Sequence, residues 1–253
     1  MINQNLEALA QQLYNFWFVQ FDFPDEEGKP YKSNGGAMIW NSALKRAVPK
    51  QWEVKPLFEA ISVQYGFPFA TEQLTDKKTN VPVVRIRNIL EGTVSSFSLE
   101  QVEEKYHLSE GDVLVGMDGN YHMNFWHDNE AYLNQRCVRL RPLADSEISS
   151  IQLLYSIKPY IKAKEKSAKG STVGHLSDSD IKELYIIKPT NTPKFNPRKQ
   201  LDQLLSLIIE NKNEMLSLIK LRDELLPLLM KGQTTLNSDL AVLLLYCIIF
   251  ANS

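Results

Sequence analysis

The sequence predicts an α+β protein in which one mixed α/β domain is attached to long coiled-coil helices. Two helical segments of similar apolar pattern, residues 5–22 and 214–231, lie near the two ends of the 253-residue chain. Between them, short apolar stretches alternate with turn residues, a pattern typical of half-buried strands. Because 43% of the residues are hydrophobic and 23% are charged, the chain can bury a core.

The first segment predicts a helix that runs to about Val19. Two sets of apolar residues recur every seven positions, which places them in seams on one helix and indicates helix pairing. The two sets are Ile2, Leu9, Phe16 and Leu6, Leu13. A group of aromatic residues at the end of this helix is too large to remain in water, so we expect it in a helix interface or beneath the following segment. The group is Tyr14, Phe16, Trp17, Phe18 and Phe21.

The middle of the chain divides into two parts by composition. Residues 23–50 are rich in Pro, Gly, Asn and Ser without a sustained period, so we expect an ordered but irregular connector after the N-terminal segment 1–22. Residues 51–195 are expected to form the mixed domain. Its predicted elements are strands at 81–89, 112–115, 137–140 and 184–187 and a helix at 147–164.

Residues 196–232 predict a long C-terminal coiled-coil helix. Residues 198–231 span about 50 Å at 1.5 Å per residue, which exceeds the helix of an average domain. One heptad position holds Leu201, Ile208, Met215 and Arg222, and another holds Leu204, Asn211, Leu218 and Leu225. Pro227 is expected to bend or end this helix, and Gly232 to stop it.

The apolar tail, residues 233–253, contains an uninterrupted apolar run at 240–250. This run is well short of the roughly 20 residues that cross a membrane, so we expect it to pack on protein. Residues 1–12 are polar and helical, unlike a signal peptide. We therefore expect no membrane association.

Cysteine and histidine usage gives no indication of a metal or a disulfide. Cys137 and Cys247 lie far apart in unlike contexts, which fits a reducing compartment, and we expect the cytoplasm. His122, His127 and Asp128 lack a fourth ligand, so no metal site is predicted. We expect no cofactor.

The enzyme classes that act on DNA or nucleotides need motifs that this sequence lacks. A P-loop requires Gly-Lys-Ser, whereas Gly116 is followed by Met117 and Asp118. Residues 191–195 only imitate the Asn-Pro-Pro-aromatic motif of adenine methyltransferases, and no Gly-rich cofactor loop accompanies them. The Glu-x-Lys triplets lack the paired aspartates of a nuclease. We therefore predict no catalytic residues.

Several separated motifs together resemble the specificity subunit of a type I restriction-modification system, at about half length. The motifs, in chain order, are NLEALAQQLYNFWFVQFDFPDEEGKPYKSNGG, VPKQWEV, VRIRNI, GDVLVGMDGN, LNQRCVRLRP, GSTVGHLSDSDIKELYIIKP and LRDELLPLLMKGQ. The resemblance implies a target-recognition domain attached to long helices. Complete family members carry two such domains on antiparallel helices, each reading one half of a bipartite DNA site.

The resemblance also implies the partners of this chain. They are double-stranded DNA, modification (methyltransferase) subunits, an ATP-dependent restriction subunit, and a second copy that restores two recognition domains. The expected interface with the second copy or the other subunits comprises Leu6, Leu9, Leu13, Phe16, Trp17, Leu201, Leu204, Ile208, Met215, Leu218 and Leu225.

Candidate DNA contacts are cations and planar hydrogen-bonding side chains, because phosphates attract the first and base edges the second. The most basic window, residues 155–175, holds five lysines and one acid. Arg85 and Arg87 would share one face of the strand predicted at 81–89. The candidates are Arg85, Arg87, Asn88, Tyr121, His122, Asn134, Gln135, Arg136, Lys164, Lys166, Lys169, Ser171, Thr172 and His175.

Each candidate group also has a purely structural explanation. The lysines could form a solvated helix end, Arg85 and Arg87 a salt-bridged strand surface, and Tyr121 and His122 a turn without ligand. For the whole chain, the sequence leaves two alternatives open. One is a coiled-coil adaptor whose middle domain binds protein, and the other is an inactive truncated fragment that does not bind DNA.

Overall fold

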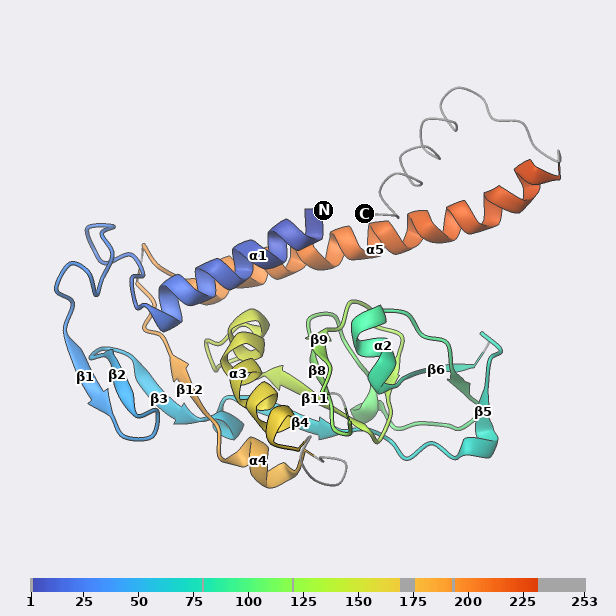
Figure 1. Ribbon diagram of the computed structural model, residues 1–253, viewed down its shortest axis with the longest axis horizontal. Helices are drawn as coiled ribbons and strands as arrows, with labels where there is room; N and C mark the ends of the chain where they lie inside the picture. Colours follow the sequence, from blue (N-terminus) through green and yellow to red (C-terminus); the bar gives the residue numbers. More distant parts are fainter. Residues whose placement is uncertain (1, 79, 120, 169–175, 193, 232–253) are drawn as a thin grey trace.

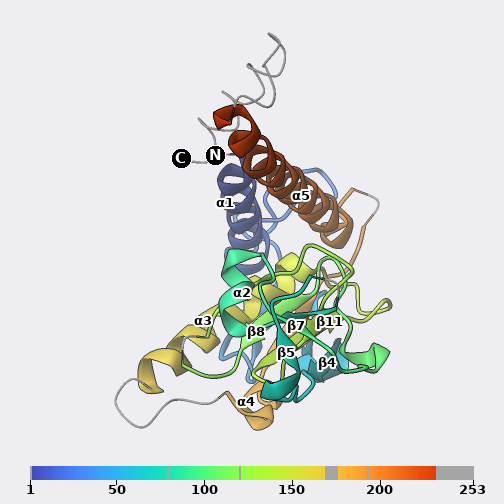
Figure 2. The same ribbon diagram turned by 90° about the vertical axis from the view of Figure 1, so that its right-hand side faces the viewer.

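The computed structural model describes residues 2–78, 80–119, 121–168, 176–192 and 194–231. Within them, five α-helices accompany four small sheets, so the predicted α+β class is confirmed. Figure 1 shows the longest helix, α5, along one side of the molecule, with α1 beside its first half and the sheets below. Figure 2 shows the two helices standing above the mixed domain when the view is turned.

The helices α1 (Ile2–Tyr14) and α5 (Pro197–Met230) pack antiparallel. Asn3 near the start of α1 donates its amide to the Ile208 carbonyl at 3.3 Å. At the other end, Trp17 meets Phe195 edge to face at 5.2 Å. The α1 helix continues as a π-helical turn, Asn15–Val19, so the predicted helix to about Val19 is regular only to Tyr14.

The α5 helix begins and continues largely as its sequence predicts. Asn196 caps its N-terminus by accepting the Lys199 N–H at 2.9 Å, and Pro197 occupies the first helical position. The expectation that Pro227 could end the helix was wrong, because α5 continues to Met230. A proline removes one hydrogen bond, and on this exposed stretch water can bind the freed carbonyl.

Among the residues that the structure describes, other elements cover only the first half of α5. Its buried apolar residues end at Ile209, and α1 starts alongside Ile208. From there to Met230, α5 extends for about 33 Å at 1.5 Å per residue. Apolar side chains such as Met215 and Leu221 stand exposed along this length. We call residues 214–230 the uncovered half of α5.

The predicted connector contains regular structure that its composition did not indicate. Strands β1 (Met38–Asn41) and β2 (Arg46–Pro49) form an antiparallel hairpin. Asn41 starts its turn by accepting the Leu44 N–H at 3.0 Å. Arg46 donates to the Phe18 carbonyl at 2.9 Å and fixes the hairpin to the end of α1.

The aromatic residues at the end of α1 form the join between helices and domain. Phe18, Phe21 and Phe23 gather around Trp52, with ring centroids 4.3 to 5.8 Å apart. Of the predicted aromatic group, Tyr14, Trp17, Phe18 and Phe21 are buried, whereas Phe16 is 39% exposed. Burial of these rings is the main source of stability at this join.

The central sheet of the mixed domain has the order β4-β11-β8-β9, all antiparallel. Its strands are β4 (Ile61–Tyr65), β8 (Val113–Gly116), β9 (Met123–Phe125) and β11 (Cys137–Pro142). The strands predicted at 112–115 and 137–140 are confirmed. A two-stranded sheet pairs β3 (Glu53–Pro56) with β12 (Tyr185–Lys188), which confirms the strand predicted at 184–187.

The second four-stranded sheet has the order β10-β6-β7-β5 and contains one parallel pair, β6 with β10. Its strands are β5 (Leu74–Thr75), β6 (Val81–Val84), β7 (Phe97–Ser98) and β10 (Tyr132–Leu133). Short 3-10 turns at Leu57–Glu59, Thr71–Gln73 and Glu104–Tyr106 complete the domain.

The strand predicted over residues 81–89 was wrong beyond Val84. The chain turns at Arg85 into helix α2 (Ile86–Glu91), which ends at Gly92 in the left-handed conformation. The Asn88 side chain accepts the Arg85 N–H at 2.9 Å and so satisfies a donor at the helix start. Arg85 and Arg87 therefore do not share a strand face.

Helix α3 (Ser150–Ala168) confirms the helix predicted at 147–164 and packs against the central sheet. Its first turns lie near α5, and its C-terminal end lies on the opposite side of the domain, close to α4 (Asp178–Lys182) (Figure 1). Gln152 donates to the Ile187 carbonyl at 2.5 Å, which joins α3 to β12.

A paired contact holds the mixed domain against α5. The Asn213 amide donates to the His127 carbonyl at 3.0 Å, and its oxygen lies 2.8 Å from Nδ1 of the same residue. The imidazole Nε2 lies 2.6 Å from the Gly92 carbonyl. His127 is buried, so these contacts satisfy polar groups that water cannot reach.

We expect Asn213→Leu to lower the free energy of unfolding by about 1 to 3 kcal/mol, because it leaves buried His127 groups without partners. Urea denaturation measures this change. The matched control is Asn211→Leu, since the Asn211 amide binds only the Leu207 carbonyl of its own helix. Equal effects of the two substitutions would contradict a role of Asn213 in holding the domain.

Candidate nucleic-acid interface

The parallel pairing of β6 with β10 brings the predicted DNA-binding segments that follow these two strands to the same edge of the sheet. Tyr132 pairs with Val83 and Leu133 with Val84, so the chain leaves both strands in one direction. Arg85 follows β6, and Asn134 follows β10. The Asn134 N–H donates to the Val84 carbonyl at 3.1 Å, which keeps the two strand ends together.

The turn after β10 is attached to the loop after β8. Met117 N–H donates to the Arg136 carbonyl at 2.9 Å, and the Arg136 guanidinium forms an ion pair with Asp118. The hydrogen bond that Arg136 donates to Asp118, reinforced by the carboxylate charge, raises the pKa of Arg136. Arg136 itself is exposed, so its position is fixed while its outer face remains open to a ligand.

The C-terminal end of α3 joins the same group of loops. Leu176 N–H donates to the Met117 carbonyl at 2.9 Å. Lys164 forms an ion pair with Asp180, and this hydrogen bond raises the pKa of Lys164. Burial acts to raise the pKa of Asp180, but hydrogen bonds from Lys164 and Ser177 outweigh it, so the pKa is lowered. Both groups are therefore charged at neutral pH.

These segments together form one surface, which we call the loop-end surface. Its members are cations or amides that are exposed or half-buried: Arg85, Arg87, Gln135, Arg136, Lys164 and Lys166. His122 is half-buried beside them, with Nδ1 3.4 Å from the Ile86 carbonyl. Helix α3 ends on the side of the domain away from α5, whereas α2 lies on the side that faces α5, where its C-cap Gly92 adjoins Lys212 (Figure 1).

Three predicted DNA contacts are buried in this structure. Asn88 has no exposed surface, and its amide donates to the Thr93 carbonyl at 2.7 Å. The Asn134 oxygen accepts the Arg136 N–H at 3.1 Å, which shapes the turn. The Tyr121 hydroxyl is buried and has no hydrogen-bond partner among the described residues. None of these side chains is presented to a ligand.

Four other candidates, Lys169, Ser171, Thr172 and His175, lie outside the described residues. Their assignment remains a prediction from the sequence. The described residues on either side of them, Lys166 and Leu176, both adjoin the loop-end surface.

Asp118 and Asp180, the carboxylate partners of Arg136 and Lys164, were not among the residues predicted from the sequence. Each lies 16 to 18 positions from its cation, so no local spacing reveals the pair. Only the fold brings them together. They matter because a carboxylate beside each cation fixes its direction and reduces its net charge.

The predicted helix-interface residues divide into two groups. Those already used within the chain are buried or pack against its core: Leu6, Leu13, Trp17, Leu201, Leu204 and Ile208. Those on outer faces are exposed or half-buried: Leu9, Phe16, Met215, Leu218 and Leu225. Only the second group remains available to a partner.

Other kinds of site find no support in the part of the chain that the structure describes. There, no group of three or more His, Cys, Asp or Glu residues could hold a metal. Burial raises the pKa of the Cys137 thiol to about 12, which keeps it protonated. Among the described helices, none is long and apolar enough to cross a bilayer.

The fold and the site define a mixed domain that presents cations on loops and is carried by antiparallel helices. A family model described as "Type I restriction modification DNA specificity domain" matches residues 49–220. This match covers more than half of the chain. The chain belongs to the type I restriction-modification specificity family, which confirms the resemblance inferred from the motifs.

Curated relatives are similar over much of the chain. It is 25% identical to the type I restriction enzyme MjaIX specificity subunit of Methanocaldococcus jannaschii, over 91% of this chain and 53% of the relative. It is 26% identical to the EcoBI specificity subunit of Escherichia coli, over 60% of this chain and 32% of the relative. The chain thus spans about half or less of the relatives it matches.

Among solved structures, the HsdS subunit from Thermoanaerobacter tengcongensis is 15% identical, with a TM-score of 0.46. The alignment covers 83% of this chain and 44% of that one.

Proposed function

We propose that residues 51–195 form a target-recognition domain that reads one half of a bipartite DNA site through the loop-end surface. The observation that carries this proposal is the gathering of Arg85, Arg136, Lys164 and Lys166 at one end of a domain that matches the DNA specificity family. Cations bind phosphates, and an arginine or glutamine at a loop tip can bind base edges.

The remaining segments would carry this domain and its partners. Residues 1–22 and 196–232 form the helical support, and residues 23–50 connect it to the domain. Modification and restriction subunits dock on the helices, and methyl transfer and ATP-driven cleavage belong to those partner chains. The chain itself is non-catalytic in this proposal.

A second copy of the chain is the proposed occupant of the uncovered half of α5. Met215, Leu218 and Leu225 line that helix at coiled-coil spacing, and the part of the chain that the structure describes leaves them exposed or half-buried. A symmetric pair would bring two recognition domains onto one DNA.

The experiment that tests DNA reading removes two cations of the loop-end surface. We expect Lys164→Ala with Lys166→Ala to weaken binding evenly across DNA sequences. The slope of log affinity against log salt should fall by about 2, because each phosphate contact contributes about 0.9. Fluorescence anisotropy over a salt series measures both quantities.

The matched control is Lys199→Ala with Lys220→Ala, two exposed lysines of α5. It should leave the slope unchanged. No measurable DNA binding by the chain with its partners would instead support an adaptor or an inactive fragment. An unchanged slope in the Lys164 and Lys166 variant would contradict their contact with phosphates.

A further inference from the structure

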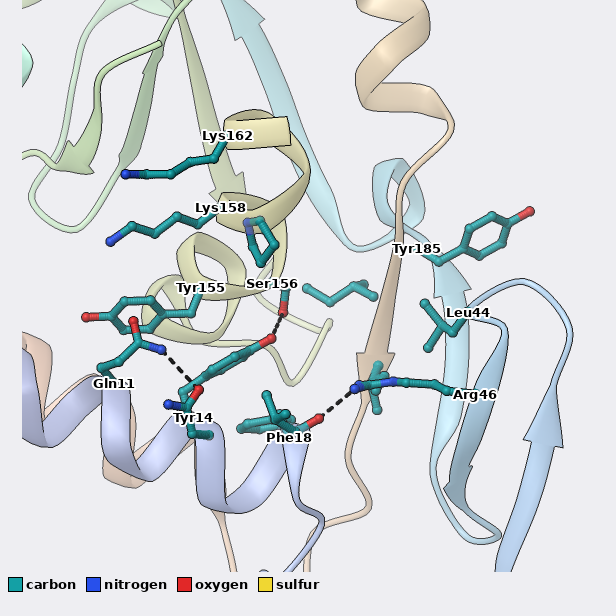
Figure 3. A pocket seen from close by; sticks show the side chains of 15 residues that line it. Gln11, Tyr14, Phe18, Leu44, Arg46, Tyr155, Ser156, Lys158, Lys162 and Tyr185 are labelled. Atoms are coloured by element: carbon teal, nitrogen blue, oxygen red, sulfur yellow. Dashed lines mark hydrogen bonds between the residues drawn. The ribbon is translucent and has the colours of Figure 1, made fainter. Parts of the chain in front are cut away.

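Helix α3 carries three lysines in a row, Lys158, Lys162 and Lys166, of which only Lys166 is among the DNA contacts predicted from the sequence. They lie four residues apart, so they share one side of the helix and span about 12 Å at 1.5 Å per residue. Figure 3 shows the side chains of Lys158 and Lys162 extending side by side from α3, away from Arg46 and Leu44. We call the three lysines the lysine row.

No carboxylate is paired with the lysine row in the part of the chain that the structure describes. Lys162 and Lys166 are exposed, Lys158 is half-buried, and none of the three forms an ion pair there. Lys164 of the same helix differs, because it is paired with Asp180. The row is therefore a group of cations whose charge is available to a ligand.

Repulsion within the row favours an anionic ligand. Like charges four residues apart on a helix repel each other. Burial lowers the pKa of Lys158, and the charge of Lys162 lowers it further, while Glu7 acts in the opposite direction. The Lys158 ammonium also lies 5.4 Å from the Tyr155 ring centre, which limits its freedom. An anion beside Lys158 and Lys162 would reduce the repulsion between them.

The lysine row starts where α3 is attached to α1. The Tyr155 hydroxyl donates to the Glu7 carbonyl at 3.3 Å. Tyr14 and Ser156 share a hydrogen bond at 3.2 Å. From this join the row runs along α3 to Lys166, near the end of the helix on the side of the domain away from α5 (Figure 1). Since Lys166 also belongs to the loop-end surface, the row connects that surface with the helical support.

Duplex DNA suits the lysine row better than a protein partner does. One DNA strand carries a phosphate for about every 3.4 Å of helix axis, so a row of about 12 Å spans about three phosphates. Protein interfaces have an apolar core. Among the described residues of α3, no large hydrophobic side chain is exposed, so the row lacks such a core. Continuity with the loop-end surface favours the same ligand for both.

We propose that the lysine row binds the phosphate backbone of the DNA that the loop-end surface reads, so that the duplex passes along α3 toward α1. The inference rests on the proposed function and adds Lys158 and Lys162 to its DNA contacts. These two contacts carry no sequence information, because every nucleotide has the same phosphate. They set the direction of the duplex relative to α1 and α5.

The test measures how salt changes the affinity of the full chain for a mixed-sequence DNA duplex. We expect Lys158→Gln with Lys162→Gln to lower the slope of log affinity against log salt by about 2, because each phosphate contact contributes about 0.9. Raising the salt about fourfold should then weaken this variant about 16-fold less than the unmodified chain. Fluorescence anisotropy over a salt series measures the affinities.

Further variants separate phosphate contact from a structural role. Lys158→Arg with Lys162→Arg keeps both charges and should keep the slope. Lys199→Gln with Lys220→Gln removes two exposed charges from α5 and should keep it as well. Lys162→Gln alone changes only an exposed position and should lower the slope by about 1, which tests the row even if the double variant is unstable. The thermal midpoint of each variant shows whether it is folded.

The lysine row and the loop-end surface can fail separately in this experiment. If Lys164→Ala with Lys166→Ala lowers the slope and Lys158→Gln with Lys162→Gln does not, only the inference about the row is overturned. If the unmodified chain with its partners does not bind the duplex, the proposed function fails and the inference fails with it.

Two other results would also overturn the inference. Selection from a random duplex library should give the same base preference for Lys158→Gln with Lys162→Gln as for the unmodified chain, and a changed preference would indicate contact with bases. If the same variant binds polyglutamate more weakly while its DNA slope is unchanged, the row serves an acidic protein partner instead of DNA.

Discussion

Exchanging Leu218 and Leu225 for aspartate is expected to convert the proposed two-chain assembly into single chains. Both residues lie on the uncovered half of α5 and are half-buried among the described residues. In a helix pair they would be buried, and an unpaired carboxylate in that position costs several kcal/mol. Sedimentation equilibrium should show the mass fall by half. DNA affinity should fall by at least about 100-fold, because two linked recognition domains no longer act together.

The control for this prediction is Ser217→Asp with Lys220→Asp, two exposed positions on the same stretch of helix. It should preserve the mass. Leu204 is unsuitable for the test, because it is buried within the single chain and its replacement would disturb the fold. If the unmodified chain sediments as a single copy at every concentration, the uncovered half of α5 does not mediate self-association.

Arg141→Met is expected to lower the free energy of unfolding by about 3 kcal/mol. Asp112 is 1% exposed, and its carboxylate accepts two hydrogen bonds from Arg141, at 2.6 and 2.7 Å. Among the described residues, the substitution leaves this buried charge with only the Ser109 N–H as a donor. Loss of one partner of a buried pair costs about 3 to 5 kcal/mol. The lower value applies because Arg141 is partly exposed. Urea denaturation measures the change.

Arg136→Met is the matched control for Arg141→Met. In its ion pair with Asp118 the Arg136 side chain is 64% exposed and that of Asp118 18%, so water reaches both partners and the change should be only about 1 kcal/mol. The comparison separates the effect of a buried carboxylate from the loss of an arginine. Similar losses in the two variants would mean that burial of Asp112 does not set the strength of its pair.

The helices could be predicted from the sequence because their signals are local. The heptads of α5 and the Asn196-Pro197 start both lie within a few residues, and the structure reproduces them. The seven-residue spacing also predicts one seam for Ile2, Leu9 and Phe16, and all three side chains are exposed. It could not show that the opposite edge of α1, with Ala10 and Tyr14, carries the contact with the rest of the chain.

The predicted strand at 81–89 continues past Val84, which is wrong for a physical reason that residue spacing alone did not reveal. The alternation of apolar residues with Arg85 and Arg87 satisfies the strand pattern, but Asn88 and Gly92 supply the start and the end of a helical turn. A strand and a helical turn are therefore both compatible with this sequence, and the side-chain hydrogen bond of Asn88 favours the helical turn. The available signal was Asn88, a polar residue three positions after the helix N-cap Arg85 and four after the end of the strand at Val84.

The candidate site was only partly predictable for a different reason. Arg136 and Lys164 were identified as cations, but their carboxylate partners come from distant segments. The exposure of each side chain could not be predicted either, because Asn88 and Asn134 have the same chemistry as surface amides and yet are buried. Residue type indicates what a side chain can bind, whereas the fold decides whether it is presented.

The parallel pairing of β6 with β10 separates residues that form the interior of the domain from residues at the strand ends that can be exchanged. Val83, Val84 and Leu133 are buried in the pairing, whereas Arg85 follows the end of β6 and Gln135 lies two positions after the end of β10. Substitution at these tips leaves the interior untouched. In the proposed function, a lineage of such chains could acquire new target sequences by changing a few tip residues, without passing through an unfolded intermediate in its evolution.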